Sequence, residues 1–186
     1  MAQDARIEAI AAALRAYDPT AWQRMPDIEL YMDQAITYLK RQLALFQGPS
    51  DASLVTPSII NNYVKDGLVP RPVNKRYAQP QLAALTMACI LKRVLPIERV
   101  KQVIAPGGEQ VDEAHYSHFC ASLAQALIGE AALLEDIDAD MPLEELALGF
   151  AMRASADCLI ADRLLALNKD QQNCQGEKKA KKPTKE

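Results

Sequence analysis

Residues 56–85, TPSIINNYVKDGLVPRPVNKRYAQPQLAAL, carry the clearest structural signals in this chain. Thr56 is a favourable N-cap and Pro57 a favourable first helical residue, so we predict a short helix that begins there and ends at Gly67. Apolar side chains occupy one side of this helix. Its other side is polar and carries Ser58, Asn61, Asn62 and Lys65 at helical spacing.

A basic, extended turn follows this helix over residues 69–77. Pro70 and Pro72 disfavour a helix or a central strand there, so we predict an extended turn or small hairpin, called the wing below. Helical periodicity resumes over residues 79–94, and a shorter helix follows Pro96 and ends before residue 106. The predicted order is therefore helix, wing, core helix and short helix.

Further from this stretch, the pattern predicts a mainly all-α chain with a small β wing. On the N-terminal side, Asp27 can cap a helix over residues 27–47 whose apolar face begins at Ile28, and residues 1–26 form an arm packed on the body. On the C-terminal side, Pro106-Gly107-Gly108 is the predicted boundary of an acidic helical hairpin over residues 109–168. Residues 169–186 are lysine-rich and predicted to be disordered. Residues 27–105 then form the central unit.

Charge is unevenly distributed along the 186 residues, whose formal net charge is −3. Residues 56–105 carry eight basic and two acidic side chains, whereas residues 106–168 carry two basic and twelve acidic ones. A basic segment can attract phosphate locally while the whole chain stays acidic. The net charge therefore does not exclude a nucleic-acid partner.

The polar helix face and the basic wing together predict double-stranded DNA as the partner. Asparagine can pair with the edge of adenine, serine can bond several bases, and lysine or arginine neutralises phosphate. We expect the helix and wing to act as the recognition helix and wing of a winged helix-turn-helix, with Tyr63 packing while its hydroxyl reaches phosphate. The predicted DNA-binding residues are Ser58, Asn61, Asn62, Tyr63, Lys65, Arg71, Lys75, Arg76 and Tyr77.

The same residues carry a resemblance to known families. Residues 56–85 resemble the MerR-like winged helix-turn-helix of bacterial transcription regulators, although Asn61-Asn62 stands where those regulators usually carry an Arg-Tyr pair. The blocks LYMDQ, INNYVKDGL and KRY also resemble an uncharacterised bacterial family known only as a domain of unknown function, over about residues 22–165. The first resemblance implies a sequence-specific transcriptional regulator, and the second implies a fold without a known role.

Other interpretations of these residues stay open. The Asn61-Asn62 face is also compatible with a solvated helix surface, and the three wing cations with ordinary surface charge. The main alternative function is a protein-protein interaction module on the same winged-helix scaffold, because a fold does not define a function. A small-molecule sensor would need a pocket with converging polar groups, and the sequence indicates no effector.

A stripe of small and apolar residues on the predicted last helix indicates a homodimer or packing against the body. Dimerisation would place two recognition helices about 34 Å apart and predict an inverted-repeat operator. The residues of this stripe, the alanine-rich face below, are Leu143, Leu146, Ala147, Phe150, Ala154, Cys158, Ala161 and Leu165.

Several functional classes find no support in the sequence. His115 and His118 lie three residues apart near Asp112 and Cys120, but we predict partial burial of both histidines rather than a metal site. No catalytic constellation or cofactor motif is present, so we expect neither an enzyme nor a cofactor. No run of apolar residues reaches about 18, and the cysteines are widely spaced, so we expect a cytoplasmic protein with reduced, mostly buried thiols and no membrane contact.

Overall fold

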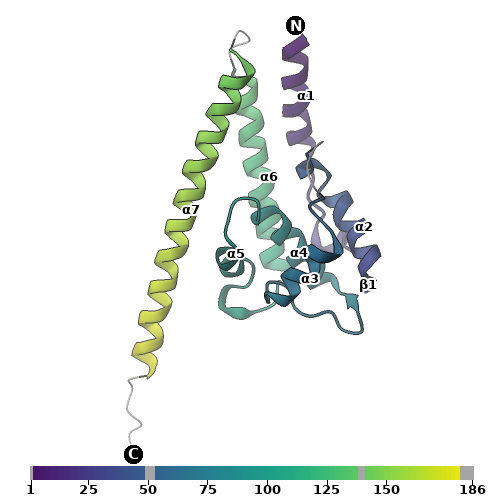
Figure 1. The fold of residues 1–186 in the computed structure, drawn as a ribbon, viewed down its shortest axis with the longest axis vertical. Helices are drawn as coiled ribbons and strands as arrows, with labels where there is room; N and C mark the ends of the chain where they lie inside the picture. Colours follow the sequence, from purple (N-terminus) through teal and green to yellow (C-terminus); the bar gives the residue numbers. More distant parts are fainter. Residues whose placement is uncertain (1, 49–52, 138–140, 181–186) are drawn as a thin grey trace, which may run out of the picture. The chain divides into compact units, whose positions relative to one another are not determined.

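The computed structural model describes residues 2–48, 53–137 and 141–180 (Figure 1). In these ranges the chain forms seven α-helices and one two-stranded antiparallel sheet. Two compact units are present, residues 1–141 and residues 142–186. The predicted class, mainly helical with a small β element, is confirmed.

Helix α4 (Gln79–Leu91) is the centre of the first unit. Its residues 81–89 are all buried, because the segment LAALTMAC is apolar or small around the whole helix circumference. Three shorter helices, α2 (Met32–Gln42), α3 (Pro57–Lys65) and α5 (Ile97–Ile104), contact it. The predicted core helix and the short helix after Pro96 are therefore both present.

One strand of the sheet lies outside the predicted wing, more than forty positions before the wing's end, with which it pairs. Strand β1 (Leu30–Tyr31) pairs antiparallel with β2 (Arg76–Tyr77), with Leu30 opposite Tyr77 and Tyr31 opposite Arg76. The prediction of one helix over residues 27–47 was therefore wrong at both ends: α2 starts at Met32, and a 3₁₀ turn, η2 (Ala44–Phe46), follows it. Strand pairing overrides helical periodicity before Met32, and it leaves Ile28 exposed.

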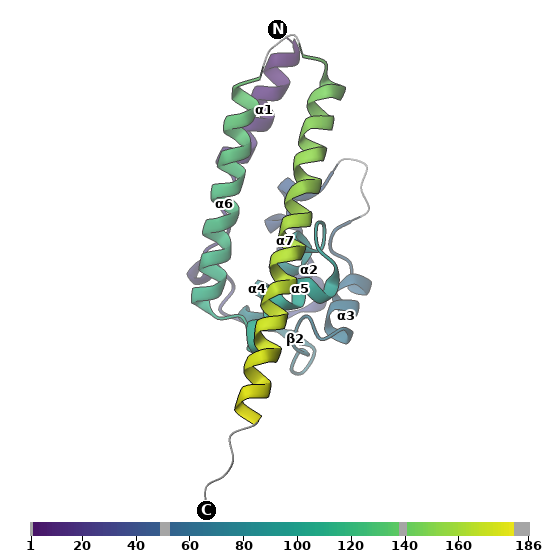
Figure 2. The same cartoon turned by 90° about the vertical axis from the view of Figure 1, so that its left-hand side faces the viewer.

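Helix α1 (Ala2–Ala16) packs along α6 (Glu113–Glu135), as Figures 1 and 2 show. Ala11 and Ala131 are buried, and Arg15 Nε donates to Glu135 Oε1 at 2.8 Å. Small side chains allow the two helix backbones to approach closely. The N-terminal arm is thus a helix that covers one side of α6.

The compact unit continues past the Pro106-Gly107-Gly108 segment, which the sequence predicts as a boundary. This segment is a 3₁₀ turn, η3 (Pro106–Gly108), and the side chains of Val111 and Tyr116 beyond it are buried. The Tyr116 ring also lies 6.1 Å, centroid to centroid, from the ring of Trp22, which belongs to η1 (Trp22–Arg24). Burial of these side chains keeps α6 in the first unit, and the division falls after residue 141.

Helix α7 (Leu143–Ala180) belongs to the second unit. It continues into the segment for which composition predicts disorder, because lysine, glutamate and glutamine extend an existing helix at little cost in free energy. Residues 181–186 of the predicted tail lie outside the described residues. The pairing of α6 and α7 as a hairpin stays a prediction.

Helix α6 bears on the expectation of no membrane contact, which stays a prediction. Among the described residues, it is the one helix that meets the requirement by length and composition. The sequence prediction counted uninterrupted apolar residues, whereas mean hydropathy tolerates the uncharged serine, glutamine and histidine of this helix.

Candidate nucleic-acid interface

Helix α3 separates its polar and apolar side chains onto opposite faces. Ile60 and Tyr63 are buried, and the helix contacts both α2 and α4. The four polar residues that the sequence places on the other face, Ser58, Asn61, Asn62 and Lys65, are all exposed. The structure therefore presents two amides, a hydroxyl and a cation on one helix surface.

Local chemistry explains why the helix has these ends. The Oγ1 of Thr56 accepts a hydrogen bond from the backbone N–H of Ile59 at 3.2 Å, which satisfies an otherwise unpaired helical donor. Gly67 adopts a positive φ of 68°, and the N–H groups of Leu68 and Val69 both donate to the carbonyl of Tyr63. The predicted helix is confirmed at both ends.

A two-residue turn lies immediately before β2 and exposes the wing cations. Val73 and Arg76 form an antiparallel bridge around Asn74 and Lys75, whose φ angles are 51° and 62°. Two consecutive residues with positive φ are the signature of a type I′ turn, which matches the twist of paired strands. Lys75 is thus held at the tip of the turn in a conformation that costs free energy for a residue with a Cβ.

Arg76 is positioned by Tyr31, a residue that the sequence prediction missed. Its Nη2 donates to Tyr31 Oη at 2.8 Å, and its guanidinium carbon lies 4.8 Å from the centroid of the Tyr31 ring. This hydrogen bond raises the pKa of Arg76, and both side chains are exposed. The contact depends on the cross-strand pairing of residues 45 positions apart, which no local pattern signals.

Gln81 anchors the start of the wing to the core helix. Its side chain is buried, its Oε1 accepts from the N–H of Ala78 at 2.7 Å, and its Nε2 donates to the carbonyl of Arg71 at 3.0 Å. A buried amide with both ends bonded fixes the backbone that it joins. The exposed Arg71 side chain therefore projects from a fixed main chain.

Lys65 and Arg71 line one groove of about 380 Å³ between the end of α3 and the start of the wing. Glu109 is the acidic residue in its lining. Lys101 on α5 adds a third cation beside the groove, because its Nζ would lie 3.6 Å from a Cβ placed on Gly67. The sequence pattern did not point to Lys101, since it lies 34 positions from Gly67 along the chain. The tertiary structure thus extends the basic surface beyond the predicted wing.

Two predicted DNA-binding residues belong to the core instead. Tyr63 and Tyr77 are 9% and 2% exposed, respectively, and burial raises the pKa of Tyr63 to about 12. Tyr77 is opposite Leu30 in the sheet, and the alternation of side chains along a strand turns it to the core face while Arg76 faces solvent. The expectation that the Tyr63 side chain packs is confirmed, but neither tyrosine lies on the exposed surface.

The strained turn leads to a prediction about stability. Lys75→Gly is expected to raise the free energy of unfolding by about 1 kcal/mol, because glycine adopts a φ of 62° without the Cβ clash. Urea denaturation of both proteins measures this change. Lys75→Ala is the matched control, since it removes the same charge but keeps a Cβ; equal stabilities of the two variants would show that the turn is unstrained.

Comparison with known protein families places this surface within one of them. The model of a family described as "Domain of unknown function (DUF1836)" matches residues 20–122, more than half of the chain. The chain belongs to the DUF1836 family. No curated protein and no solved structure matches it.

The DUF1836 match contains every residue of the candidate interface and the first part of α6, and it ends before α7 begins. Membership in an uncharacterised family, predicted from the LYMDQ, INNYVKDGL and KRY blocks, is therefore confirmed. The more specific resemblance to MerR-like regulators stays a prediction.

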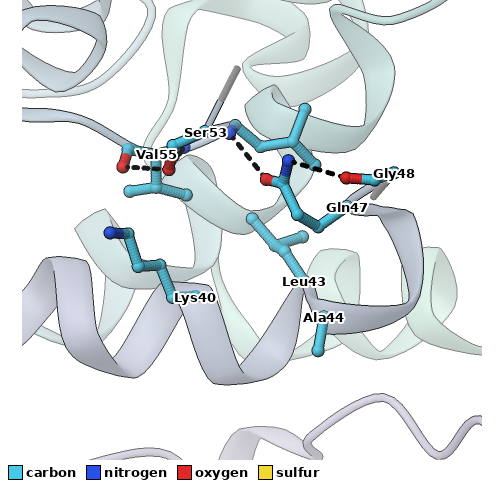
Figure 3. Close-up of a pocket in the computed structure, with 8 residues that line it drawn as sticks. Lys40, Leu43, Ala44, Gln47, Gly48, Ser53 and Val55 are labelled. Atoms are coloured by element: carbon cyan, nitrogen blue, oxygen red, sulfur yellow. Dashed lines mark hydrogen bonds between the residues drawn. The ribbon is translucent and has the colours of Figure 1, made fainter. Parts of the chain in front are cut away.

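A pocket of about 510 Å³ lies within the DUF1836 region, between α2 and the segment that precedes α3 (Figure 3). The buried side chains of Leu43 and Val55 line it, and Lys40 is the charged residue among its lining. The Gln47 amide is bonded to the main chain, accepting from the Leu54 N–H at 3.0 Å and donating to the Gly48 carbonyl at 3.5 Å. These bonds stabilise the entry to α3.

The DUF1836 region and the rest of the described chain hold no group of three or more His, Cys, Asp or Glu residues that could bind a metal. Asp112 instead caps α6, its Oδ1 accepting from the N–H of His115 at 2.8 Å. His115 is half-buried, but His118 is exposed, contrary to the prediction of partial burial for both, because it faces away from Tyr116.

The described cysteines are free thiols. Cys89 is buried, and desolvation raises its pKa to about 12; Cys120 and Cys158 are half-buried, and the side chain of Cys174 lies outside the described part. A thiol with a raised pKa stays protonated and unreactive at neutral pH.

Proposed function

We propose that this protein is a sequence-specific, double-stranded-DNA-binding transcriptional regulator. In this proposal residues 27–105 act as a winged helix-turn-helix of the MerR-like type. Helix α3 enters the major groove, and the turn before β2 contacts the phosphate backbone. The observation that carries the proposal is the exposed polar face of the capped helix α3 beside the basic surface of the wing.

The chemistry of each residue suits a separate part of the contact. Asn61 and Asn62 have the donor and acceptor needed for a bidentate pair with adenine, and Ser58 can bond a base edge near the helix N-terminus. Lys65, Arg71, Lys75 and Arg76 neutralise phosphate, which sets affinity and register but carries no sequence information. Tyr31 then positions Arg76, and Lys101 adds a further phosphate contact.

The arrangement of the elements also supports this division of roles. Figures 1 and 2 both show α3 and the loop that leads to β2 at the same end of the first unit. Lys65 and Arg71 share one groove, so the recognition helix and the wing form adjoining surfaces. Two such surfaces in a homodimer would match an inverted repeat one helical turn apart.

A selection experiment tests sequence-specific binding. The full chain is incubated with sheared genomic DNA from its source and excess random competitor, and the bound DNA is sequenced. The proposal predicts an enriched inverted repeat that Asn61→Ala/Asn62→Ala abolishes. Absence of enrichment, or enrichment that the variant retains, would favour the protein-interaction module instead.

The salt dependence of affinity gives a separate prediction for the wing. Lys75→Ala is expected to weaken binding to all DNA sequences and to reduce the slope of log affinity against log salt by about one. Affinity titrations between about 50 and 200 mM salt measure this slope. An unchanged slope would remove Lys75 from the phosphate contacts.

A further inference from the structure

Helix α7 carries apolar residues on two opposite faces. At 100° per residue, the alanine-rich face centred on Phe150 and Ala154 lies across the helix from a second apolar face. The second face, which we call the 148–160 face, consists of Leu148, Met152, Ala156, Leu159 and Ile160. A helix that is apolar on two faces needs more than one neighbour to cover it.

The 148–160 face is the more exposed of the two. Met152 and Leu159 are each 58% exposed, and Leu148 and Ile160 are nearly as accessible. On the alanine-rich face, Leu143, Ala147 and Ala154 are exposed as well, but the other five members, Leu146, Phe150, Cys158, Ala161 and Leu165, are half-buried. The large exposed side chains of the 148–160 face therefore form a candidate docking surface.

The 148–160 face has an acidic residue, Glu145, beyond one end and a basic residue, Arg163, beyond the other. Glu145 and Arg163 are exposed and stand eighteen residues apart, which is five turns of 3.6 residues and about 27 Å, so both lie on the line of the apolar side chains. The other charged residues between positions 143 and 165 lie roughly 90° or more around the helix axis from the centre of the 148–160 face. They are Glu144, Arg153, Asp157 and Asp162.

Most of the pattern is symmetric about position 154. Leu148 and Ile160 are equally distant from that point, as are Met152 and Ala156, and Glu145 and Arg163; Leu159 is the exception, because its counterpart is Gly149. A second α7 running antiparallel would place Leu148 beside the partner copy's residue 159, and Glu145 against the partner copy's residue 163, twice over. A parallel pair would instead bring like charges together at both ends.

We infer that the 148–160 face binds the same face of a second copy of this chain, with the two α7 helices antiparallel. An isologous interface needs a surface that is complementary to itself under twofold rotation, and the order of charges and apolar residues along α7 meets this condition. This interface would supply the dimer of the proposed function, but it does not depend on DNA binding.

Charge reversal with sedimentation analysis of the full chain tests this inference. Wild type is expected to dimerise with concentration, and Glu145→Arg and Arg163→Glu are each expected to weaken dimerisation about tenfold, because each change turns two attractive pairs into repulsive ones. The double variant Glu145→Arg/Arg163→Glu is expected to regain wild-type affinity. The two positions are too far apart to interact within one helix, so recovery reports contact between copies.

Glu144→Arg is the matched control. It changes the same charge in the same first turn of α7, and therefore has the same effect on the helix dipole, but it lies about 100° away around the helix. Its dimer affinity should change less than about twofold. Wild type that stays monomeric, single reversals without effect, or a double reversal that fails to restore affinity would each overturn the antiparallel interface.

The outcomes also separate this inference from the proposed function. Dimerisation that follows the charge reversals in a protein with no sequence-specific DNA binding would support the interface and refute the regulator. Specific DNA binding by a protein whose self-association is unchanged by the two single charge reversals and the double reversal would support the regulator and refute the interface.

Discussion

Replacement of Ile60 by alanine is expected to lower the free energy of unfolding by about 2 to 5 kcal/mol. Ile60 is completely buried on the inner face of α3, where the helix packs on α2 and α4. The change removes the buried apolar surface and leaves a cavity, because close-packed neighbours collapse into it only partially. Urea denaturation with an unchanged m-value would give this loss directly.

Asn61→Ala, one residue further along the helix, is the control for this effect. Asn61 is exposed, and alanine has the higher helix propensity, so stability should stay within about 0.5 kcal/mol of wild type or rise slightly. A loss below about 1 kcal/mol for Ile60→Ala, or a loss for Asn61→Ala as large as that for Ile60→Ala, would contradict the division of α3 into a core face and an exposed polar face.

Asn62→Ala is expected to cost about 1 to 3 kcal/mol in binding to the specific DNA site, with little change on random DNA. The exposed Asn62 amide can pair with a base edge, and its removal leaves the phosphate contacts proposed for the wing intact. Competition titrations with both DNAs at one salt concentration measure the difference.

Lys75→Ala provides the contrast for this measurement, since loss of a phosphate contact weakens binding to every sequence equally. Equal losses on specific and random DNA from Asn62→Ala would exclude base recognition by that residue. The folded state of the variant should match wild type in thermal unfolding, because Asn62 lies on the exposed face of α3.

Helix α3 shows how far local sequence rules reach. Its cap, its two faces and its glycine stop all depend on residues within a few positions of one another, and the structure confirms each of them. The core helix α4 was equally predictable, because an apolar run of that length between a proline and charged residues has few alternatives. Interactions of this range are encoded in consecutive residues.

Strand β1 shows where those rules stop. Residues 27–31 fit the periodicity of the helix that follows, but Leu30 and Tyr31 pair with β2 instead, and this pairing also brings Tyr31 to Arg76. The same dependence on distant residues turned Tyr77 into the core and brought Lys101 beside the end of α3. Each of these placements involves partners tens of residues away.

The amino-acid sequence alone was therefore sufficient to predict the helical class, helix α3 and its polar face, because helix capping and periodicity act over one or two turns. The position of the sheet, the anchoring of Arg71 and Arg76, and the packing of α1 on α6 required the folded chain. Their free energy comes from burial and hydrogen bonds between segments that meet only after folding, and such contacts leave no periodic pattern in either segment.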